Sequence, residues 1–258
     1  MTWGVVILAG GLTPDPLASQ IGTPRKALAQ IEGRTCLAWT LDAVAGAGIG
    51  EIVVVGGEDI KEHVHTGSWV EEQAGHIDNA RAGVAALPDC DAFLFLPCDT
   101  PFLRSSGVRH YVDSVSSRID SNQERFYSAG ICPLSDFDAL FPNWEDPYLK
   151  LKDGDYRSGA YYATSRAGFE HASQIFEEFS ASRKNQGKML MRLGLGTLVR
   201  YLLHLISTAE AEKRASKLFE GQAILVSDCD PYAMADLDNI NDLECLLKYA
   251  PEILGSQS

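Results

Sequence analysis

The chain has little positive charge and no paired spacing of cysteines. Its 258 residues include 22 Lys and Arg against 35 Asp and Glu, which gives a formal net charge of −13. No basic cluster is dense enough to follow a phosphate backbone, so we expect no nucleic-acid partner. The six cysteines form no Cys-x-x-Cys pair, and no signal-peptide pattern precedes the first apolar strand. Both features favour reduced thiols and a cytoplasmic location.

Long uncharged apolar runs are also missing. The most apolar stretch, residues 189–206, carries Arg192, Arg200 and His204, so we expect no membrane span. Packing within the domain or across a homodimer is the expected role of this stretch, while shelter for an apolar acceptor or contact with a membrane surface stays open. Scattered histidines and the lack of a Gly-x-Ser-x-Gly motif give no prediction of a zinc site or a serine hydrolase.

What is present is an alternation of apolar strands with helical stripes. Residues 5–8, 52–55 and 93–96 are apolar runs of strand length, and apolar residues recur at helical spacing over 37–48 and 77–87. A hydrophobic content of 45% is enough for one substantial core. The pattern predicts an α/β fold with a doubly wound, mostly parallel, Rossmann-like sheet.

The second half of the chain has a different pattern. Residues 148–152 alternate like a strand and precede an Asp-Gly turn, which predicts an antiparallel hairpin. We therefore divide the chain into a nucleotide-binding core over 1–142, an α+β insertion with hairpin and helices over 143–221, and a return to the core sheet with a final helix over 222–258.

A glycine turn follows the first predicted strand in the segment Leu8-Ala9-Gly10-Gly11, and the basic pair Arg25-Lys26 comes downstream. Glycines lack Cβ, so their N–H groups can approach a phosphate closely. Lys26 would add a point charge. These residues predict a loop that binds nucleotide phosphates.

Two acidic motifs accompany this loop. Asp99 follows the apolar run 93–96, and ligands of open parallel sheets bind at the carboxyl ends of the strands. Asp236 and Asp238 alternate in what we expect to be a short strand before the final helix, so both would lie on one face. Carboxylates suit Mg²⁺ or Mn²⁺. Which of the two late aspartates binds a metal beside Asp99 stays open.

These motifs, in this order, resemble those of the MobA-like NTP transferase superfamily, which includes molybdenum-cofactor guanylyltransferase and related cytidylyltransferases. The resemblance covers about residues 1–118 and 222–250 and implies a GT-A-like nucleotidyltransferase fold. It also implies that Asn79, in the segment Asp78-Asn79-Ala80-Arg81-Ala82-Gly83-Val84, contacts the nucleotide base.

The same resemblance makes Arg157, Ser158 and Gly159 candidates for acceptor binding, with a surface hairpin of no such role as the alternative. One departure concerns the triphosphate. Family members place an arginine soon after the paired glycines, whereas residues 12–24 contain no basic residue and Arg25 is expected to substitute.

The implied activity is nucleotidyl transfer, in which an acceptor attacks the α-phosphorus of an NTP and pyrophosphate leaves. Lys26 and Asp99 are the expected catalytic residues, and the acceptor is expected to be a small, phosphorylated molecule. The NTP and the acceptor stay open. Two alternatives remain: a sugar-nucleotide-dependent glycosyltransferase, because related enzymes also use Asp-x-Asp with a metal, and a catalytically degenerate nucleotide-binding regulatory protein.

Overall fold

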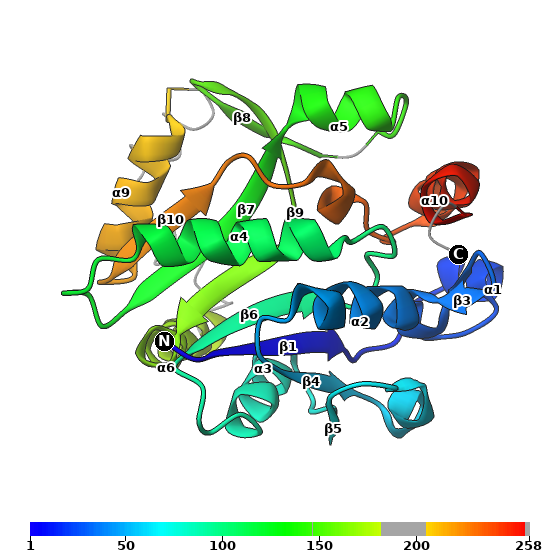
Figure 1. The fold of residues 1–258 in the computed structure, drawn as a ribbon, viewed down its shortest axis with the longest axis horizontal. Coiled ribbons are helices and arrows are strands. Elements are labelled where there is room, and N and C mark those ends of the chain that lie inside the picture. Colours follow the sequence, from blue (N-terminus) through cyan, green and yellow to red (C-terminus); the bar gives the residue numbers. More distant parts are fainter. Residues whose placement is uncertain (146, 182–204, 256–258) are drawn as a thin grey trace.

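The fold is built on one mixed sheet with helices on both faces (Figure 1). The computed structural model describes residues 1–145, 147–181 and 205–255. The strand order is β10-β7-β9-β6-β1-β4-β5, and β8 pairs with β9. These strands are β1 (Trp3–Ala9), β4 (Glu51–Gly56), β5 (Ser68–Glu71), β6 (Ala92–Pro97), β7 (Phe126–Pro133), β8 (Leu149–Leu151), β9 (Gly154–Ser165) and β10 (Gln222–Val226).

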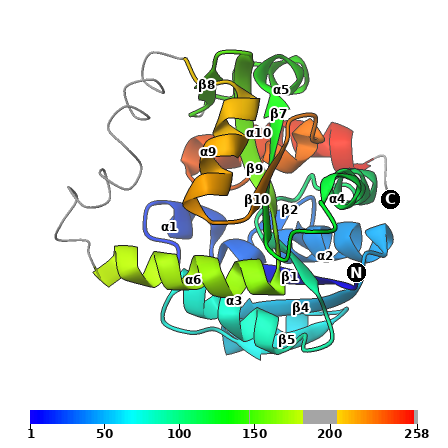
Figure 2. The same cartoon turned by 90° about the vertical axis from the view of Figure 1, so that its left-hand side faces the viewer.

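Helices cover both faces of this sheet. Figure 2 shows α2 and α4 on one face, and α3, α6 and α9 on the other. The described α-helices are α1 (Leu17–Ile21), α2 (Cys36–Ala47), α3 (His76–Ala85), α4 (Ser105–Arg118), α5 (Leu134–Leu140), α6 (Arg166–Ala181), α9 (Thr208–Leu218) and α10 (Ile240–Leu254). Short 3₁₀ segments lie at η1 (Lys26–Leu28), η2 (Glu58–His63) and η3 (Pro231–Met234), and a small ribbon pairs β2 (Gln30–Ile31) with β3 (Arg34–Thr35).

Four of the seven strand pairs described for the main sheet are parallel, which confirms the predicted fold class. Strand β1 pairs in parallel with β4 and β6, and β4–β5 and β10–β7 are also parallel. In β1, Val5 and Ile7 belong to the larger core cluster and Val6 to a smaller one. Successive side chains of a strand point to opposite faces, and a sheet covered on both faces needs apolar residues at each position. The uninterrupted apolar run is explained by this double burial.

Strand β9 is the antiparallel member of the sheet. It lies between β6 and β7 and pairs with both in antiparallel fashion, and its first residues form a hairpin with β8. Segment 143–221 thus contributes a strand to the central sheet, and the boundaries at 142 and 221 stay a prediction. The apolar stretch 189–206 lies outside the described residues except for its last two. Among the described helices, none is long and apolar enough to cross a membrane.

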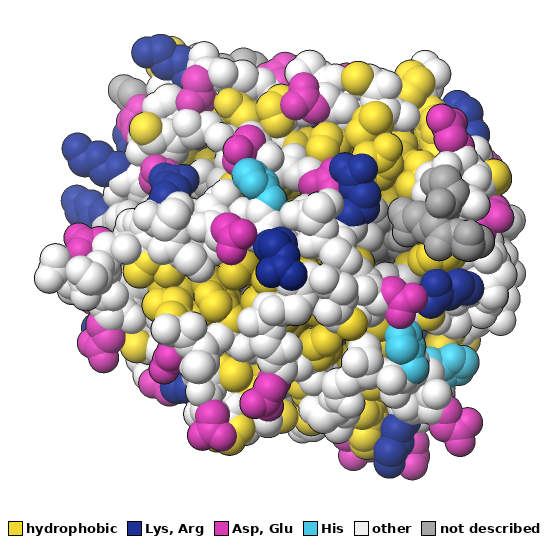
Figure 3. Space-filling model, in the orientation of Figure 1, with side chains coloured by type: hydrophobic (Ala, Val, Ile, Leu, Met, Phe, Trp, Pro, Cys, Tyr) yellow, Lys and Arg dark blue, Asp and Glu magenta, His cyan; other side chains and the backbone are white. Residues whose placement is uncertain are grey.

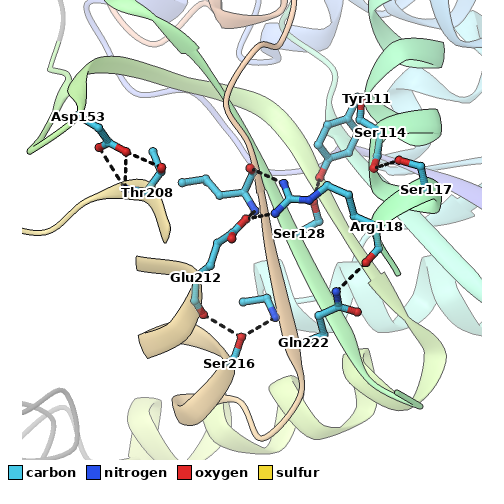
Figure 4. Close-up of polar contacts among 12 residues, drawn as sticks. Tyr111, Ser114, Ser117, Arg118, Ser128, Asp153, Thr208, Glu212, Ser216 and Gln222 are labelled. Atoms are coloured by element: carbon cyan, nitrogen blue, oxygen red, sulfur yellow. Dashed lines mark hydrogen bonds and ion pairs between the residues drawn. The ribbon is translucent and has the colours of Figure 1, made fainter. Parts of the chain in front are cut away.

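Strand β10 lies at one edge of the sheet, and helix α9 packs along that edge (Figure 4). The Ala223 N–H donates to Ser216 Oγ at 2.9 Å, and the Leu225 N–H donates to Glu212 Oε1 at 2.7 Å. Arg118 of α4 donates to the same Glu212 oxygen. Unpaired backbone groups make edge strands prone to association. Side chains of α9 satisfy alternate N–H groups of this edge and fix the helix to the sheet.

Candidate active site

The glycine turn directly follows β1, as predicted. Gly11 has φ of +88°, a conformation that favours glycine. A Cβ at Gly10 would lie 2.7 Å from Asn79 Nδ2 and 2.8 Å from Glu72 Oε2, so only glycine fits there without a shift of its neighbours. The Gly11 N–H donates to Glu72 Oε2 at 2.6 Å. The turn therefore presents a backbone donor, and a carboxylate accepts it.

Arg25 is almost fully buried and binds the same carboxylate. Its Nη1 donates to Glu72 Oε2 at 2.9 Å and to the Gly11 carbonyl at 3.1 Å, while its Nε donates to Asp59 at 3.0 Å. Hydrogen bonds from Arg25 hold the pKa of Glu72 below its ordinary value. The guanidinium therefore lies at the glycine turn, where the missing early arginine would be needed, but it is paired with two carboxylates.

Lys26 lies between two carboxylates. Its Nζ is 3.1 Å from Asp99 Oδ2 and 2.5 Å from Asp238 Oδ1. Asp99 follows β6 and is 7% exposed. Burial lowers the pKa of Lys26, but the two carboxylates outweigh this effect and the pKa is raised. Burial also raises the pKa of Asp99, against the opposing effect of Lys26. Three of the predicted residues thus form one charged cluster.

The segment that carries the late aspartates is not a strand. Residues 235–238 have no ladder pairing, which corrects the expected short strand, although the Leu237 N–H donates to the Asp99 carbonyl at 3.1 Å. A capping box between Asn239 and Asp242 begins α10, and Asp242 also accepts the Asp238 N–H at 3.0 Å. These backbone bonds, rather than strand pairing, hold the segment beside Asp99.

The two aspartates have different surroundings. Asp238 joins Asp99 in binding Lys26. Asp236 lies near Tyr162, whose pKa is raised by burial and by the charge of Asp236. Asp99 and Asp238 thus share the ammonium of Lys26.

The acidic pair fits a divalent cation that also binds substrate. Among the described residues, no group of three or more His, Cys, Asp and Glu could hold a metal ion. Asp99 and Asp238 nevertheless converge on one cation, the Lys26 ammonium. Mg²⁺ is commonly held by one or two carboxylates together with substrate phosphates. The donor set suits Mg²⁺ or Mn²⁺ in that shared arrangement.

Asn79 lies beside the glycine turn, and its side-chain oxygen accepts a backbone hydrogen bond. It is 6% exposed, and its Oδ1 accepts the Gln73 N–H at 2.5 Å. This bond fixes the loop after β5, which carries Glu72. No sequence motif marks Glu72 or Gln73, because both follow a short, half-exposed edge strand.

The three predicted acceptor residues differ in exposure. Arg157 is 1% exposed, with its guanidinium carbon 4.1 Å from the centroid of the Phe137 ring. Gly159 packs against η3, where an added Cβ would lie 2.7 Å from the Ala233 carbonyl. Ser158 is exposed. Packing explains why arginine and glycine occupy positions 157 and 159. An acceptor role for Arg157, Ser158 and Gly159 stays a prediction.

An apolar cavity of about 590 Å³ lies between the sheet and helices α3, α6 and α9. Its described lining includes Leu8 of β1, Ile77 and Ala80 of α3, Tyr162 of β9 and Phe169 of α6. Leu8 comes two residues before Gly10, so one end of the cavity is close to the glycine turn. The sequence pattern did not predict this cavity.

Charged side chains on the face shown in Figure 3 are mixed in sign. Basic groups are scattered among acidic ones and form no continuous patch on that face. At the candidate site, the described cations Arg25 and Lys26 are each paired with carboxylates.

Comparisons with known proteins agree with this architecture. Residues 5–124 match the family model of the MobA-like NTP transferase domain. No curated protein matches the chain. Solved structures that match include a hypothetical transferase from Thermus thermophilus, with 25% identity, a TM-score of 0.79, and coverage of 94% of this chain and 100% of the other.

Two further solved structures share the fold at lower identity. 4-Diphosphocytidyl-2C-methyl-D-erythritol synthase from Anaerococcus prevotii matches with 13% identity, a TM-score of 0.57, and coverage of 96% of this chain and 97% of its own. A CMP:2-keto-3-deoxy-manno-octonic acid synthetase in complex with CTP matches with 14% identity, a TM-score of 0.56, and coverage of 100% and 99%. The match over residues 5–124 and the similarity to the solved transferase from Thermus thermophilus support a transferase enzyme whose first half resembles a MobA-like NTP transferase domain.

Proposed function

We propose that the enzyme transfers an NMP group from an NTP to a small, phosphorylated acceptor with the help of Mg²⁺ or Mn²⁺. The observation that carries this proposal is the position of Lys26 between Asp99 and Asp238. The neighbouring residue, Arg25, hydrogen-bonds to the Gly11 carbonyl at 3.1 Å. The phosphate-binding turn and the acidic pair are therefore joined through two consecutive basic residues.

In the proposed reaction, an acceptor oxygen forms a bond to the α-phosphorus of the NTP. The bond from that phosphorus to the oxygen that bridges to the β-phosphate breaks, and its electron pair leaves with pyrophosphate. An ionised phosphate acceptor needs no general base. Catalysis then depends on the alignment of the two reactants and on stabilisation of negative charge.

Separate residues would bind the nucleotide, stabilise the developing charge and hold the metal ion. The turn from Leu8 to Gly11 would bind the nucleotide through backbone groups, and Asn79 would contact the base or hold the loop beside it. Lys26 would stabilise charge on the phosphoryl oxygens. Asp99 and Asp238 would hold the divalent cation, which would supply further positive charge near the phosphates.

Ligand-induced thermal stabilisation tests this proposal, because a ligand that binds the folded state raises the apparent stability. The protein is heated with ATP, CTP, GTP or UTP, each with and without Mg²⁺, and D99N serves as the control. We expect selective stabilisation by one NTP that requires Mg²⁺ and is lost in D99N. Stabilisation by nucleotide sugars without any response to NTPs would instead support a glycosyltransferase.

Turnover is then measured as pyrophosphate release with a panel of phosphorylated acceptors. We expect release only with both the selected NTP and an acceptor. Tight NTP binding without release across a broad panel would contradict the transferase proposal and favour a regulatory nucleotide-binding protein.

A further inference from the structure

The carboxylate of Glu72 contacts the groups that we expect to bind the triphosphate. Its Oε2 accepts the Gly11 N–H at 2.6 Å and a bond from Arg25 Nη1 at 2.9 Å. Its Oε1 lies 2.6 Å from Arg25 Nη2. Glu72 therefore receives both a backbone N–H of the glycine turn and the forked face of the guanidinium.

Such donors serve phosphate as well as carboxylate. An arginine fork binds either anion in bidentate fashion, and backbone N–H groups in a turn form a concave anion site. Arg25 is also bound by Asp59 at 3.0 Å, so one cation faces two carboxylates. A triphosphate that approaches this turn therefore finds the Gly11 N–H and the Arg25 guanidinium already bound to carboxylates. The negative charge of those carboxylates also repels it.

We propose that Glu72 is an internal competitor for the phosphate-binding groups and thereby sets the affinity of the enzyme for its triphosphate. This inference rests on the proposed function. The Glu72 carboxylate leaves the Gly11 N–H and Arg25 when the triphosphate binds, and it returns when the phosphates leave. The donors are thus kept paired in the absence of nucleotide, which limits the cost of burying Arg25.

The surroundings of Glu72 permit this exchange by rotation of its side chain. The Glu72 N–H donates to the Gly56 carbonyl at 3.0 Å, and the next N–H, of Gln73, donates to Asn79. Backbone hydrogen bonds therefore hold the chain on both sides of the Glu72 Cα atom. The side chain itself is 24% exposed, so the carboxylate can turn toward solvent without movement of the loop.

The test compares two variants of Glu72 with a matched control. E72Q keeps the side-chain shape but loses the charge, and E72A removes the carboxylate altogether. D59N is the control, because it removes the other carboxylate from Arg25 while the Gly11 N–H keeps its bond to Glu72. Thermal unfolding of each variant is recorded first to establish that it is folded.

Binding is measured by titration calorimetry with Mg²⁺, using tripolyphosphate and the NTP selected by thermal stabilisation. We expect E72Q and E72A to bind tripolyphosphate about five- to tenfold more tightly than the wild type, which corresponds to about 1 kcal/mol. D59N should change the affinity less than either variant of Glu72. Equal or weaker binding of tripolyphosphate by both Glu72 variants would overturn the inference and show that Glu72 positions Arg25 for the ligand.

The binding data distinguish failure of the competitor role of Glu72 from failure of the proposed nucleotide site. If the wild type and all variants bind the NTP with one common affinity, the competitor role is wrong and the nucleotide site stands. If none of them binds any NTP or tripolyphosphate, the proposed function is wrong together with the inference. A gain for tripolyphosphate with a loss for the NTP would show that Glu72 competes with phosphates and also contacts the nucleoside.

Discussion

The ammonium group of Lys26 lies 3.1 Å from a carboxylate oxygen of Asp99, where that buried carboxylate would otherwise face a metal ion. Asp238 Oδ1 lies 2.5 Å from the same ammonium. A divalent cation and Lys26 would therefore use the same oxygens. We expect Lys26 to turn toward the phosphates when a metal–nucleotide complex binds, so that the lysine serves as counter-ion before binding and as phosphate ligand afterwards.

Replacement of Lys26 should separate metal binding from turnover. In K26M the carboxylates lose their internal cation, so we expect Mn²⁺ alone to bind as tightly as in the wild type or more tightly. Pyrophosphate release should fall by about 10² or more, because an electrostatic contact to the transition state is missing. Titration of Mn²⁺ by electron paramagnetic resonance and steady-state kinetics measure the two effects. Loss of Mn²⁺ binding together with unchanged turnover would contradict this assignment.

Glu72 should stabilise the protein in a pH-dependent way. Its pKa is depressed in the folded state by Arg25, so the stabilisation is present above the unfolded pKa and disappears as the pH falls through the folded one. E72Q should lower the free energy of unfolding by about 1 kcal/mol at pH 7. Urea unfolding should show this difference shrinking below about pH 4, near the ordinary glutamate pKa. A constant difference across this range would exclude the ion pair as its cause.

Asn79 offers a test of loop support against base contact. N79A removes the acceptor of the Gln73 N–H and should cost about 1 kcal/mol of stability. If Asn79 acts by holding the loop, the affinities for all four NTPs should fall by similar factors. If it contacts the base, the preferred NTP should lose most. Calorimetric titration of each NTP into N79A distinguishes the two, and unchanged affinity for every NTP would remove Asn79 from the site.

The contacts of α9 with the sheet edge should contribute to stability and leave the active site unaffected. S216A removes the acceptor of the Ala223 N–H and should lower the free energy of unfolding by about 1–2 kcal/mol. S117A is a suitable control, because Ser117 bonds only within α4, to the Ser114 carbonyl, among the contacts shown in Figure 4. Chemical denaturation compares them. Equal changes in the free energy of unfolding would mean that the contact of Ser216 with the sheet edge adds no more stability than a bond within α4.

The sheet and the main charged cluster could be predicted from local pattern. Uninterrupted apolar runs occur where a strand is buried on both faces, as at Val5 and Val6. Asp99 directly follows such a run, so its position at a strand end followed from the run itself. Crowding at Gly10 and the positive φ of Gly11 explain why glycine occupies both positions, while their binding of phosphate stays a prediction.

Other features depend on partners far away in the chain. Glu72 follows a half-exposed edge strand, and only the fold brings it to Arg25 and Gly11. The segment around Leu237 alternates like a strand, but its backbone is held by Asp99 and a capping box rather than by a ladder. Arg157, a candidate for acceptor binding, is buried against Phe137. A charged residue in a strand gives no local indication that an aromatic ring will cover it.

The most direct test of the central claim is titration of the selected NTP, in the presence of Mg²⁺, into the wild type, D238N and its near neighbour D236N. Because Asp238 shares Lys26 with Asp99 while Asp236 lies near Tyr162, we expect D238N to lose the Mg²⁺-dependent part of the affinity and D236N to keep most of it. Retention of Mg²⁺-dependent binding in D238N, with its loss in D236N, would contradict the assignment of Asp99, Lys26 and Asp238 as the metal–nucleotide site.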